Sequence, residues 1–471
     1  MVLLGAVALA ACGGDGGDAG SGGAGGAGAT GGPGATGGPG ATGGPGATGG
    51  PGATGGPGAT TGPGGGTDTT VSTGASPDTT VSTGASPATT GTGTPNPACA
   101  DGVDITPPSG NPFAGGRLFV DPEYVEKVES SIAKVTDEAL IAKMRKVQEI
   151  PTAFWLDRIA AVERLPGHLD KALELQNQLC EPVIPVVVVY DLPNRDCFAE
   201  ASNGELHLNE NGTERYRNEF IKPIKEILAA RPNQRIILII EPDSLPNIAT
   251  NLGGKRCDQE TADSYEANVA FALKELNMPH VYQYIDAAHS GWLGWEDNQK
   301  KGAEIFARVI EAAGSPASVR GFATNVANYT LLSYSEGEES YDQQDNPCYG
   351  EFDYVNAMGR ALEAEGLGDK HFIIDTSRNG VGGIRGDWGY WCNNIGAGMG
   401  ERPKANPGGA TRLDAFYWVK PPGDSDGVGQ PDQPRYDLFC GKEDADTRAP
   451  QAGAWFHEYF VECVKNANPP L

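Results

Sequence analysis

Short apolar segments alternate with helical segments about seven times between Cys99 and the C-terminus, and this alternation constrains the fold more than any other feature. The apolar segments are typical of buried parallel strands, because each is short and is bounded by turn or polar residues. The five clearest are residues 185–190, 235–240, 281–285, 372–374 and 415–419, and two weaker candidates are residues 152–156 and 321–324.

Helical periodicity fills the intervals between these segments. Apolar residues recur every three or four positions in residues 125–147, 169–179, 215–228, 265–276, 303–313 and 355–364. No Gly-rich phosphate loop follows the early strands, which disfavours an open doubly wound sheet. We therefore predict an α/β fold, a distorted (β/α) barrel of about seven parallel strands that resembles a TIM barrel.

The first 98 residues differ in composition from the rest and hold two repeats. Residues 31–60 repeat Gly-Gly-Pro-Gly-Ala-Thr, and residues 68–87 repeat Asp-Thr-Thr-Val-Ser-Thr-Gly-Ala-Ser-Pro. Neither repeat can bury a core, so we expect a disordered linker over residues 13–98 and a folded domain over residues 99–471. Since Gly stands at every third position from Gly22 to Gly58, a collagen-like trimeric stalk is the alternative.

The N-terminus resembles a bacterial lipoprotein signal. Residues 1–11 form an apolar run that ends in Leu9-Ala10-Ala11 and is followed by Cys12, as in the lipobox whose Cys is acylated after cleavage. The run is too short to cross a bilayer. We expect residues 1–12 to be a signal segment with Cys12 as the lipidated residue, and the protein to be secreted or attached to the cell surface without a membrane-spanning segment.

The remaining cysteines favour disulfide bonds over a zinc site, because none of them shows C-x-x-C spacing or paired His residues. This set consists of Cys99, Cys180, Cys197, Cys257, Cys348, Cys392, Cys440 and Cys463. We therefore expect no metal site.

The charge balance narrows the choice of partner. The chain has 35 Lys plus Arg against 61 Asp plus Glu, which gives a formal net charge of -26. Long-range repulsion would slow every encounter with nucleic acid or an anionic membrane. Neutral and cationic ligands remain open.

Polar side chains, mostly carboxylates, follow nearly every predicted strand. In α/β barrels the carboxyl ends of the strands build the active site, so these side chains are expected to converge on one acidic cleft. Any single Asp among them has helix capping as an alternative role, but recurrence after six strands favours a cleft. The residues are Asp191, Asp196, Glu241, Asp243, Asp286, Asn325, Asp375, Asp424 and Asp426.

Tryptophans in Gly-rich loops add a second signal. Trp292 and Trp295 follow the strand that ends near Asp286, and Trp388 and Trp391 follow the strand that ends near Asp375. Flat rings on rim loops suit the apolar faces of sugars, while carboxylates suit sugar hydroxyls. Packing in the core is the alternative for Trp292 and Trp295.

Several motifs together resemble glycoside hydrolase family 6, in order from Asn111 to the C-terminus. They are YDLPNRDC at 190–197, IEPDSL at 240–245, DAAHSGWLGW at 286–295, GFATNVANY at 321–329, WVKPPGDSDG at 418–427 and QAGAWF at 451–456. The resemblance implies a distorted barrel of about seven strands and inverting hydrolysis of the β-1,4-glucan of cellulose. We expect no cofactor.

The resemblance also implies catalytic roles. Asp243 matches the general acid, and Asp196 matches the residue that keeps this acid protonated, as neighbouring carboxylates push their pKa values apart. Asp426 matches the usual candidate for the base, acting directly or through a water chain held near Ser202, because inversion needs room for a water opposite the acid. Tyr190 would press on the distorted sugar at the cleavage point.

Further residues are implied to bind substrate or to stabilise the loops. Trp292, Trp295 and Trp391 would line successive glucose subsites, and Lys420 and Asp424 would hydrogen-bond sugar hydroxyls. His289, Asn325 and Arg378 complete the predicted substrate-binding set, with Lys420 and Arg378 also pairing with Asp426. The resemblance pairs Cys197 with Cys257 and Cys392 with Cys440, and it leaves the other four cysteines of the domain without partners.

The mode of attack depends on the loops over the cleft. Segments 195–204 and 426–440 look full length and Trp295 matches a tunnel-entrance platform, which favours a cellobiohydrolase that releases cellobiose from non-reducing chain ends; an endoglucanase is the alternative. We expect the catalytic domain to be monomeric. Two alternatives belong to other functional classes of protein. One is a metal-dependent hydrolase with Asp196, Glu241, Asp243, Asp286 and His289 as ligands, and the other is a glucan-binding module without activity.

Overall fold

The computed structural model describes residue 99, residues 102–334 and residues 344–471. The predicted signal segment, Cys12 and both repeats lie outside these residues. All seven predicted strands are present and belong to one curled sheet with the order β2-β4-β5-β6-β7-β8-β10-β9. Their bounds are β2 (Phe154–Leu156), β4 (Val186–Val189), β5 (Ile236–Ile240), β6 (Val281–Asp286), β7 (Val319–Thr324), β8 (His371–Asp375), β10 (Leu413–Tyr417) and β9 (Lys404–Ala405).

The sheet curls until its first and last parallel strands approach each other, which confirms the predicted distorted barrel. Neighbouring strands from β2 to β10 all pair in parallel, whereas the short β9 pairs antiparallel with β10. A parallel bridge joins Thr152, just before β2, to Trp418, just after β10. The Ala153 amide donates to the Trp418 carbonyl over 3.1 Å, so the first and last parallel strands meet at one bridge. A separate parallel pair joins β1 (Arg117–Leu118) to β3 (Val183–Ile184).

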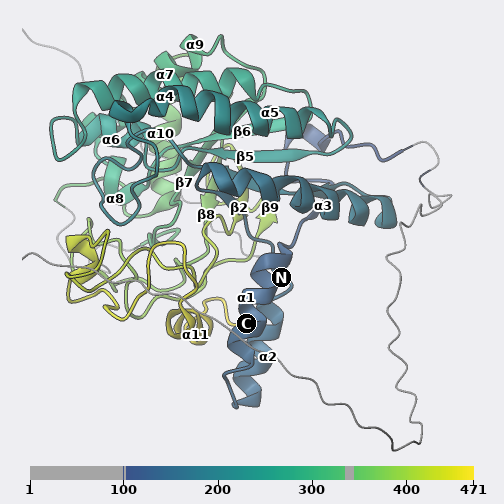
Figure 1. The fold of residues 1–471 in the computed structure, drawn as a ribbon, viewed down its shortest axis with the longest axis vertical. Helices are drawn as coiled ribbons and strands as arrows, with labels where there is room; N and C mark the ends of the chain where they lie inside the picture. Colours follow the sequence, from purple (N-terminus) through teal and green to yellow (C-terminus); the bar gives the residue numbers. More distant parts are fainter. Residues whose placement is uncertain (1–98, 100–101, 335–343) are drawn as a thin grey trace, which may run out of the picture. The chain divides into compact units, whose positions relative to one another are not determined.

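Helices surround the sheet, and Figure 1 shows α5, α7 and α9 along its outer side. The α-helices are α1 (Pro122–Ile132), α2 (Glu138–Val147), α3 (Leu165–Leu179), α4 (Gly212–Arg215), α5 (Lys222–Ala229), α6 (Leu245–Thr250), α7 (Gln259–Glu275), α8 (Ser290–Leu293), α9 (Glu296–Ala312), α10 (Glu351–Ala364) and α11 (His457–Lys465). A π-helical segment (Tyr216–Ile221) joins α4 to α5, and short 3-10 turns occupy Pro108–Gly110, Ile159–Arg164, Leu208–Glu210 and Leu438–Gly441. No helix in the described part of the chain has the length and apolar character needed to span a bilayer.

The helical period predicted over residues 125–147 is broken into two helices. α1 ends at Ile132 and α2 begins at Glu138, and the Asp137 side chain accepts hydrogen bonds from the amides of Ala139 and Leu140. An N-cap of this kind stabilises a new helix start. The apolar period continues across the break because both helices bury their apolar faces in the same hydrophobic cluster.

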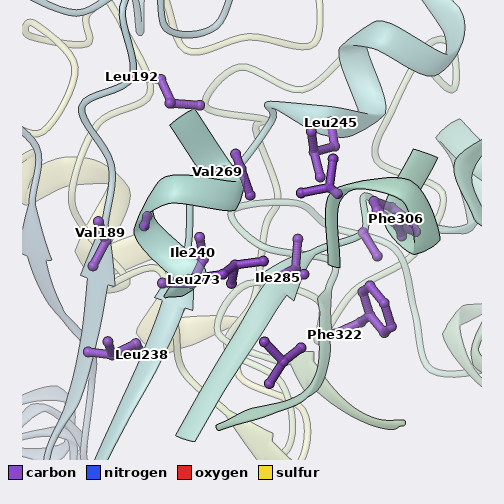
Figure 2. Packing of buried hydrophobic residues seen from close by; sticks show 14 of the residues in the cluster. Val189, Leu192, Leu238, Ile240, Leu245, Val269, Leu273, Ile285, Phe306 and Phe322 are labelled. Atoms are coloured by element: carbon purple, nitrogen blue, oxygen red, sulfur yellow. The ribbon is translucent and has the colours of Figure 1, made fainter. Parts of the chain in front are cut away.

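The core has two layers that follow the alternation of side chains along each strand. Leu238 and Ile240 point outward and belong to the larger cluster, where Figure 2 shows Ile240 and Ile285 facing Val269 and Leu273 of α7. Their neighbours Ile237 and Ile239 fill the barrel interior with the equivalent residues of the other strands. Burial on both faces explains why the strands read as continuous apolar runs.

Three disulfides tie the domain together. Cys197–Cys257 and Cys392–Cys440 form as the resemblance implies, and Cys99 pairs with Cys180 at the end of α3. Cys348 and Cys463 are buried free thiols, so the expectation of disulfides was wrong for these two. Cys348 and Cys463 each belong to a hydrophobic cluster, where free Cys behaves as a small hydrophobic residue.

Candidate active site

The backbone turns sharply where three neighbouring strands end. Glu241 and Asp243 follow β5 with φ values of 48° and 59°, Ala288 follows β6 at 57°, and Asn325 follows β7 at 59°. Left-handed φ values are unfavourable for residues other than Gly and cluster at functional sites. The strain redirects these side chains at the rim of the barrel, and the Asp243 amide is held by the Asp286 carboxylate at 3.1 Å.

A cleft of about 1330 Å³ lies at this rim. Its volume exceeds the range of about 300–1,000 Å³ typical of sites for small ligands, so it has room for an extended chain. Every predicted catalytic residue and most predicted substrate-binding residues line it. These are Tyr190, Asp196, Ser202, Asp243, His289, Trp292, Trp295, Trp391, Lys420, Asp424 and Asp426.

Asp243 is suited to keep its proton at a pH where an ordinary carboxyl has lost it. Burial raises the pKa of the Asp243 carboxyl well above its usual range, and the carboxylates of Asp196 and Asp286 raise it further. Burial also raises the pKa of Asp196, although the Ser202 hydroxyl, which donates to its carboxylate, and the nearby Arg195 oppose the shift. The cleft therefore contains a carboxyl that stays protonated beside a second one that competes for the proton.

Asp426 has the opposite environment. Burial alone would raise the pKa of its carboxyl, but Arg378 at 2.8 Å and Lys420 at 3.2 Å outweigh burial and lower it. The Asn393 amide donates at 2.9 Å and the Tyr329 hydroxyl at 3.0 Å. Asp426 is therefore ionised over the range in which Asp243 is protonated, and these two carboxyls differ in protonation as an acid and a base require.

Two predicted substrate-binding residues lie behind the cleft instead of in its lining. Asn325 is fully buried, and its amide donates to the Asp375 carbonyl at 2.9 Å and the Thr330 carbonyl at 3.2 Å. Arg378 is also fully buried, and its guanidinium holds Asp426. Direct sugar contacts predicted for these two residues do not fit their positions, because both side chains are buried beneath the cleft surface.

Two tryptophans of the cleft, Trp292 and Trp295, are fixed by their ring nitrogens. Trp292 donates to the Thr250 hydroxyl at 2.7 Å and Trp295 donates to the Gln344 carbonyl at 2.9 Å. The Trp295 ring meets the Trp388 ring edge-on at 5.5 Å between centroids. Trp292 also packs partly against the main core, so the same side chain contributes to the core and to the lining of the cleft. Flat faces held at fixed angles can stack on sugar rings.

Sequence reasoning missed two residues that contact Tyr190. The Trp155 ring lines the cleft, meets the Tyr190 ring edge-on at 5.4 Å and donates to the Val419 carbonyl at 2.8 Å. The Arg195 guanidinium lies 4.1 Å over the Tyr190 ring and donates to the Ser202 carbonyl at 2.9 Å. Trp155 lies near the carboxyl end of β2, and a residue at this position could have been predicted from the sequence to face the active-site rim.

Two segments that line the cleft are joined to each other, at a contact that we call the seam. The Glu200 amide donates to the Asp437 carboxylate at 2.6 Å, and the Arg435 guanidinium donates to the Asn203 carbonyl at 3.0 Å. One segment is anchored by Cys197–Cys257 and the other by Cys392–Cys440. The seam connects residues 195–204 with residues 426–440.

The five residues considered as metal ligands do not gather into a cluster that could hold an ion within the described residues. Glu241 lies below the cleft, where its carboxylate accepts from the Tyr216 hydroxyl at 2.8 Å and from two backbone amides. His289 lines the cleft, and burial together with Arg385 lowers its pKa to about 3, which keeps the ring neutral. Its ring contacts the Asn328 amide at 3.0 Å.

Known proteins are similar to this chain in sequence and in fold. The family model described as glycosyl hydrolases family 6 matches residues 113–467. The 1,4-beta-D-glucan cellobiohydrolase CEL6C of Podospora anserina is 46% identical over 376 residues, which cover 79% of this chain and 91% of that protein. Exoglucanase-6A of Humicola insolens is 44% identical over 367 residues, covering 77% of this chain and 76% of the relative.

A solved structure is similar to this chain in fold as well as in sequence. Cellobiohydrolase II (Cel6A) from Humicola insolens, in complex with glucose and cellotetraose, superposes with a TM-score of 0.73 at 44% identity. The match covers 77% of this chain and 100% of that one.

Proposed function

The chain belongs to glycosyl hydrolase family 6, and on this premise we propose that it is a 1,4-β-cellobiohydrolase acting on cellulose. It hydrolyses β-1,4-glucosidic bonds with inversion and releases cellobiose from non-reducing ends. The observation that carries this proposal is an extended cleft that holds one protonated and one ionised carboxyl and is lined by two segments joined at the seam.

The carboxyls support a single-displacement reaction. The Asp243 proton passes to the glycosidic oxygen as the bond from this oxygen to the anomeric carbon breaks. A water attacks the anomeric carbon from the opposite face and gives its proton to Asp426, directly or through a further water near Ser202. Asp196, which accepts from the Ser202 hydroxyl, stabilises positive charge on the sugar ring.

The seam supports attack at chain ends. Because residues 195–204 and 426–440 are hydrogen-bonded to each other, a chain enters more readily by threading from its end than by lateral binding. An endoglucanase of the same family is the alternative, since opening of these segments would admit internal positions of a chain.

A proton NMR time course on cellohexaose tests reaction and mode together. We expect the α-anomer to appear first and cellobiose to dominate the products, because an inverting enzyme converts a β-linkage into an α-product. Early β-anomer would refute the inverting mechanism. Mixed product lengths on longer glucans would favour the endoglucanase, and an absence of cleavage would favour the binding module.

Loosening the seam should increase internal cutting. Arg435→Ala removes the bond to the Asn203 carbonyl, worth about 1 kcal/mol, and so raises the open population about fivefold. The measurement is the ratio of viscosity loss to reducing ends released from carboxymethylcellulose, which should rise. Arg448→Ala is the control, because Arg448 pairs with Asp446 outside the cleft lining. The seam has no role in exo action if both variants keep the parent ratio.

We also propose that the protein works outside the cell. Its three disulfides support folding in an oxidising compartment. Lipid attachment through Cys12, the linker over residues 13–98 and a monomeric catalytic domain over residues 99–471 stay predictions.

A further inference from the structure

Part of the cleft wall comes from outside the barrel. α1 contributes Lys127, whose ammonium lies 2.8 Å and 3.0 Å from the two carboxylate oxygens of Asp424. The side chains are 34% and 11% exposed respectively, so the pair is partly shielded from water and still faces the cleft.

The position of Lys127 does not depend on this ion pair, because other contacts fasten α1. The Tyr124 hydroxyl donates to the Pro422 carbonyl at 3.0 Å, and its ring meets the Trp455 ring edge-on at 5.9 Å. Tyr124 and Val128 are buried in one cluster with residues of α2 and α11, which lies next to the α1–α2 pair in Figure 1. α1 therefore presents Lys127 to the cleft from a rigid support.

The pair lies close to Asp426 in the lining of the cleft. Asp424 stands two residues before Asp426, and the Lys420 ammonium contacts Asp426 at 3.2 Å and lies 5.8 Å from the centre of the Trp155 ring. A sugar stacked on Trp155 would turn its edge toward the polar residues of this wall. The wall offers an ammonium donor beside a carboxylate acceptor. Two neighbouring sugar hydroxyls can use both groups, because one hydroxyl can accept from the ammonium while the next donates to the carboxylate.

Resting on the proposed function, we propose that Lys127 is a substrate-binding residue that contacts the glucosyl unit stacked on Trp155. Lys127 donates to one hydroxyl of this unit, and Asp424, held in place by Lys127, accepts from another. The ion pair thus acts in substrate binding close to Asp426 and takes no part in proton transfer.

The test is steady-state kinetics on cellotetraose. Lys127→Met should raise KM about tenfold while kcat changes less than about threefold, because the lost contacts are made equally in the ground state and the transition state. Lys127→Arg keeps the charge and should stay within about threefold of the parent KM. Lys146→Met is the matched control, since Lys146 is an exposed residue of α2 outside the cleft lining.

A structural role gives a different result. If Lys127→Met lowers the melting temperature but leaves KM within twofold of the parent, the inference is wrong. Lys127→Gln serves the same comparison if the Met variant does not fold. Failure of the proposed function is recognised separately, because the parent would then not cleave cellotetraose, and calorimetric titration of the parent and Lys127→Met with cellotetraose would decide the binding role alone.

Discussion

Replacing Asp243 by Asn is expected to lower kcat on cellotetraose by roughly 10³-fold while KM stays within about threefold, since a general acid contributes about 10²–10⁴-fold. The amide has nearly the shape of the carboxyl but cannot give up a proton at the required point. The leaving sugar would then depart as an alkoxide. The measurement is a stopped assay of cellobiose release, with Asp369→Asn as a control because the Asp369 side chain is 75% exposed.

The pH dependence of activity is a second test of Asp243 as the general acid. Burial and the carboxylates of Asp196 and Asp286 raise the pKa of Asp243. The acid works only while it is protonated, so activity should fall as pH rises through this raised pKa. The alkaline limb should be absent from the residual activity of Asp243→Asn. A variant that keeps more than about a tenth of the parent kcat, with the limb intact, would show that another group is the acid.

Replacing Asp426 by Asn is expected to cost about 3–5 kcal/mol of unfolding free energy, because it leaves a buried charge without its counter-ion. Arg378 is fully buried, and Asp426 is the carboxylate that it contacts at 2.8 Å. Turnover should fall about 10²-fold or more as well, since the amide cannot accept the proton of the attacking water. Urea unfolding followed by tryptophan fluorescence measures the first effect.

Asp424→Asn is the matched control for stability. It makes the same substitution two residues earlier, but its partner Lys127 is 34% exposed and can be hydrated when the carboxylate is lost. We expect a loss of about 1 kcal/mol or less, because water can solvate the Lys127 ammonium once its partner is neutral. Equal losses of unfolding free energy in the two variants would contradict the idea that burial of Arg378 makes Asp426 important for folding.

The barrel and the convergence of its carboxylates were predictable from sequence because they depend on local patterns. Strands buried on both faces read as apolar runs, and parallel strands all end at the same rim. Asp196, Asp243 and Asp426 therefore had to lie near one another once the strands were identified. The family motifs then assigned roles that the pattern alone left open between capping and catalysis.

Tertiary packing decided which polar side chains reach the cleft. Asn325 and Arg378 follow strands just as Asp243 does, yet both are buried behind the lining. Their environment depends on side-chain direction and on neighbours distant in sequence. Lys127 entered the cleft for the same reason, since α1 is attached to residues 422 and 455 by contacts that no local periodicity encodes.

Cysteine pairing shows the same division. Composition and spacing favoured disulfides, but which of Cys99, Cys180, Cys348 and Cys463 would pair depended on the distance between their backbones after folding. Local sequence thus determined the strands and their polar ends, because backbone geometry repeats over a few residues. The depth of each side chain and its partners were set by the fold, because they depend on contacts between segments far apart in the chain.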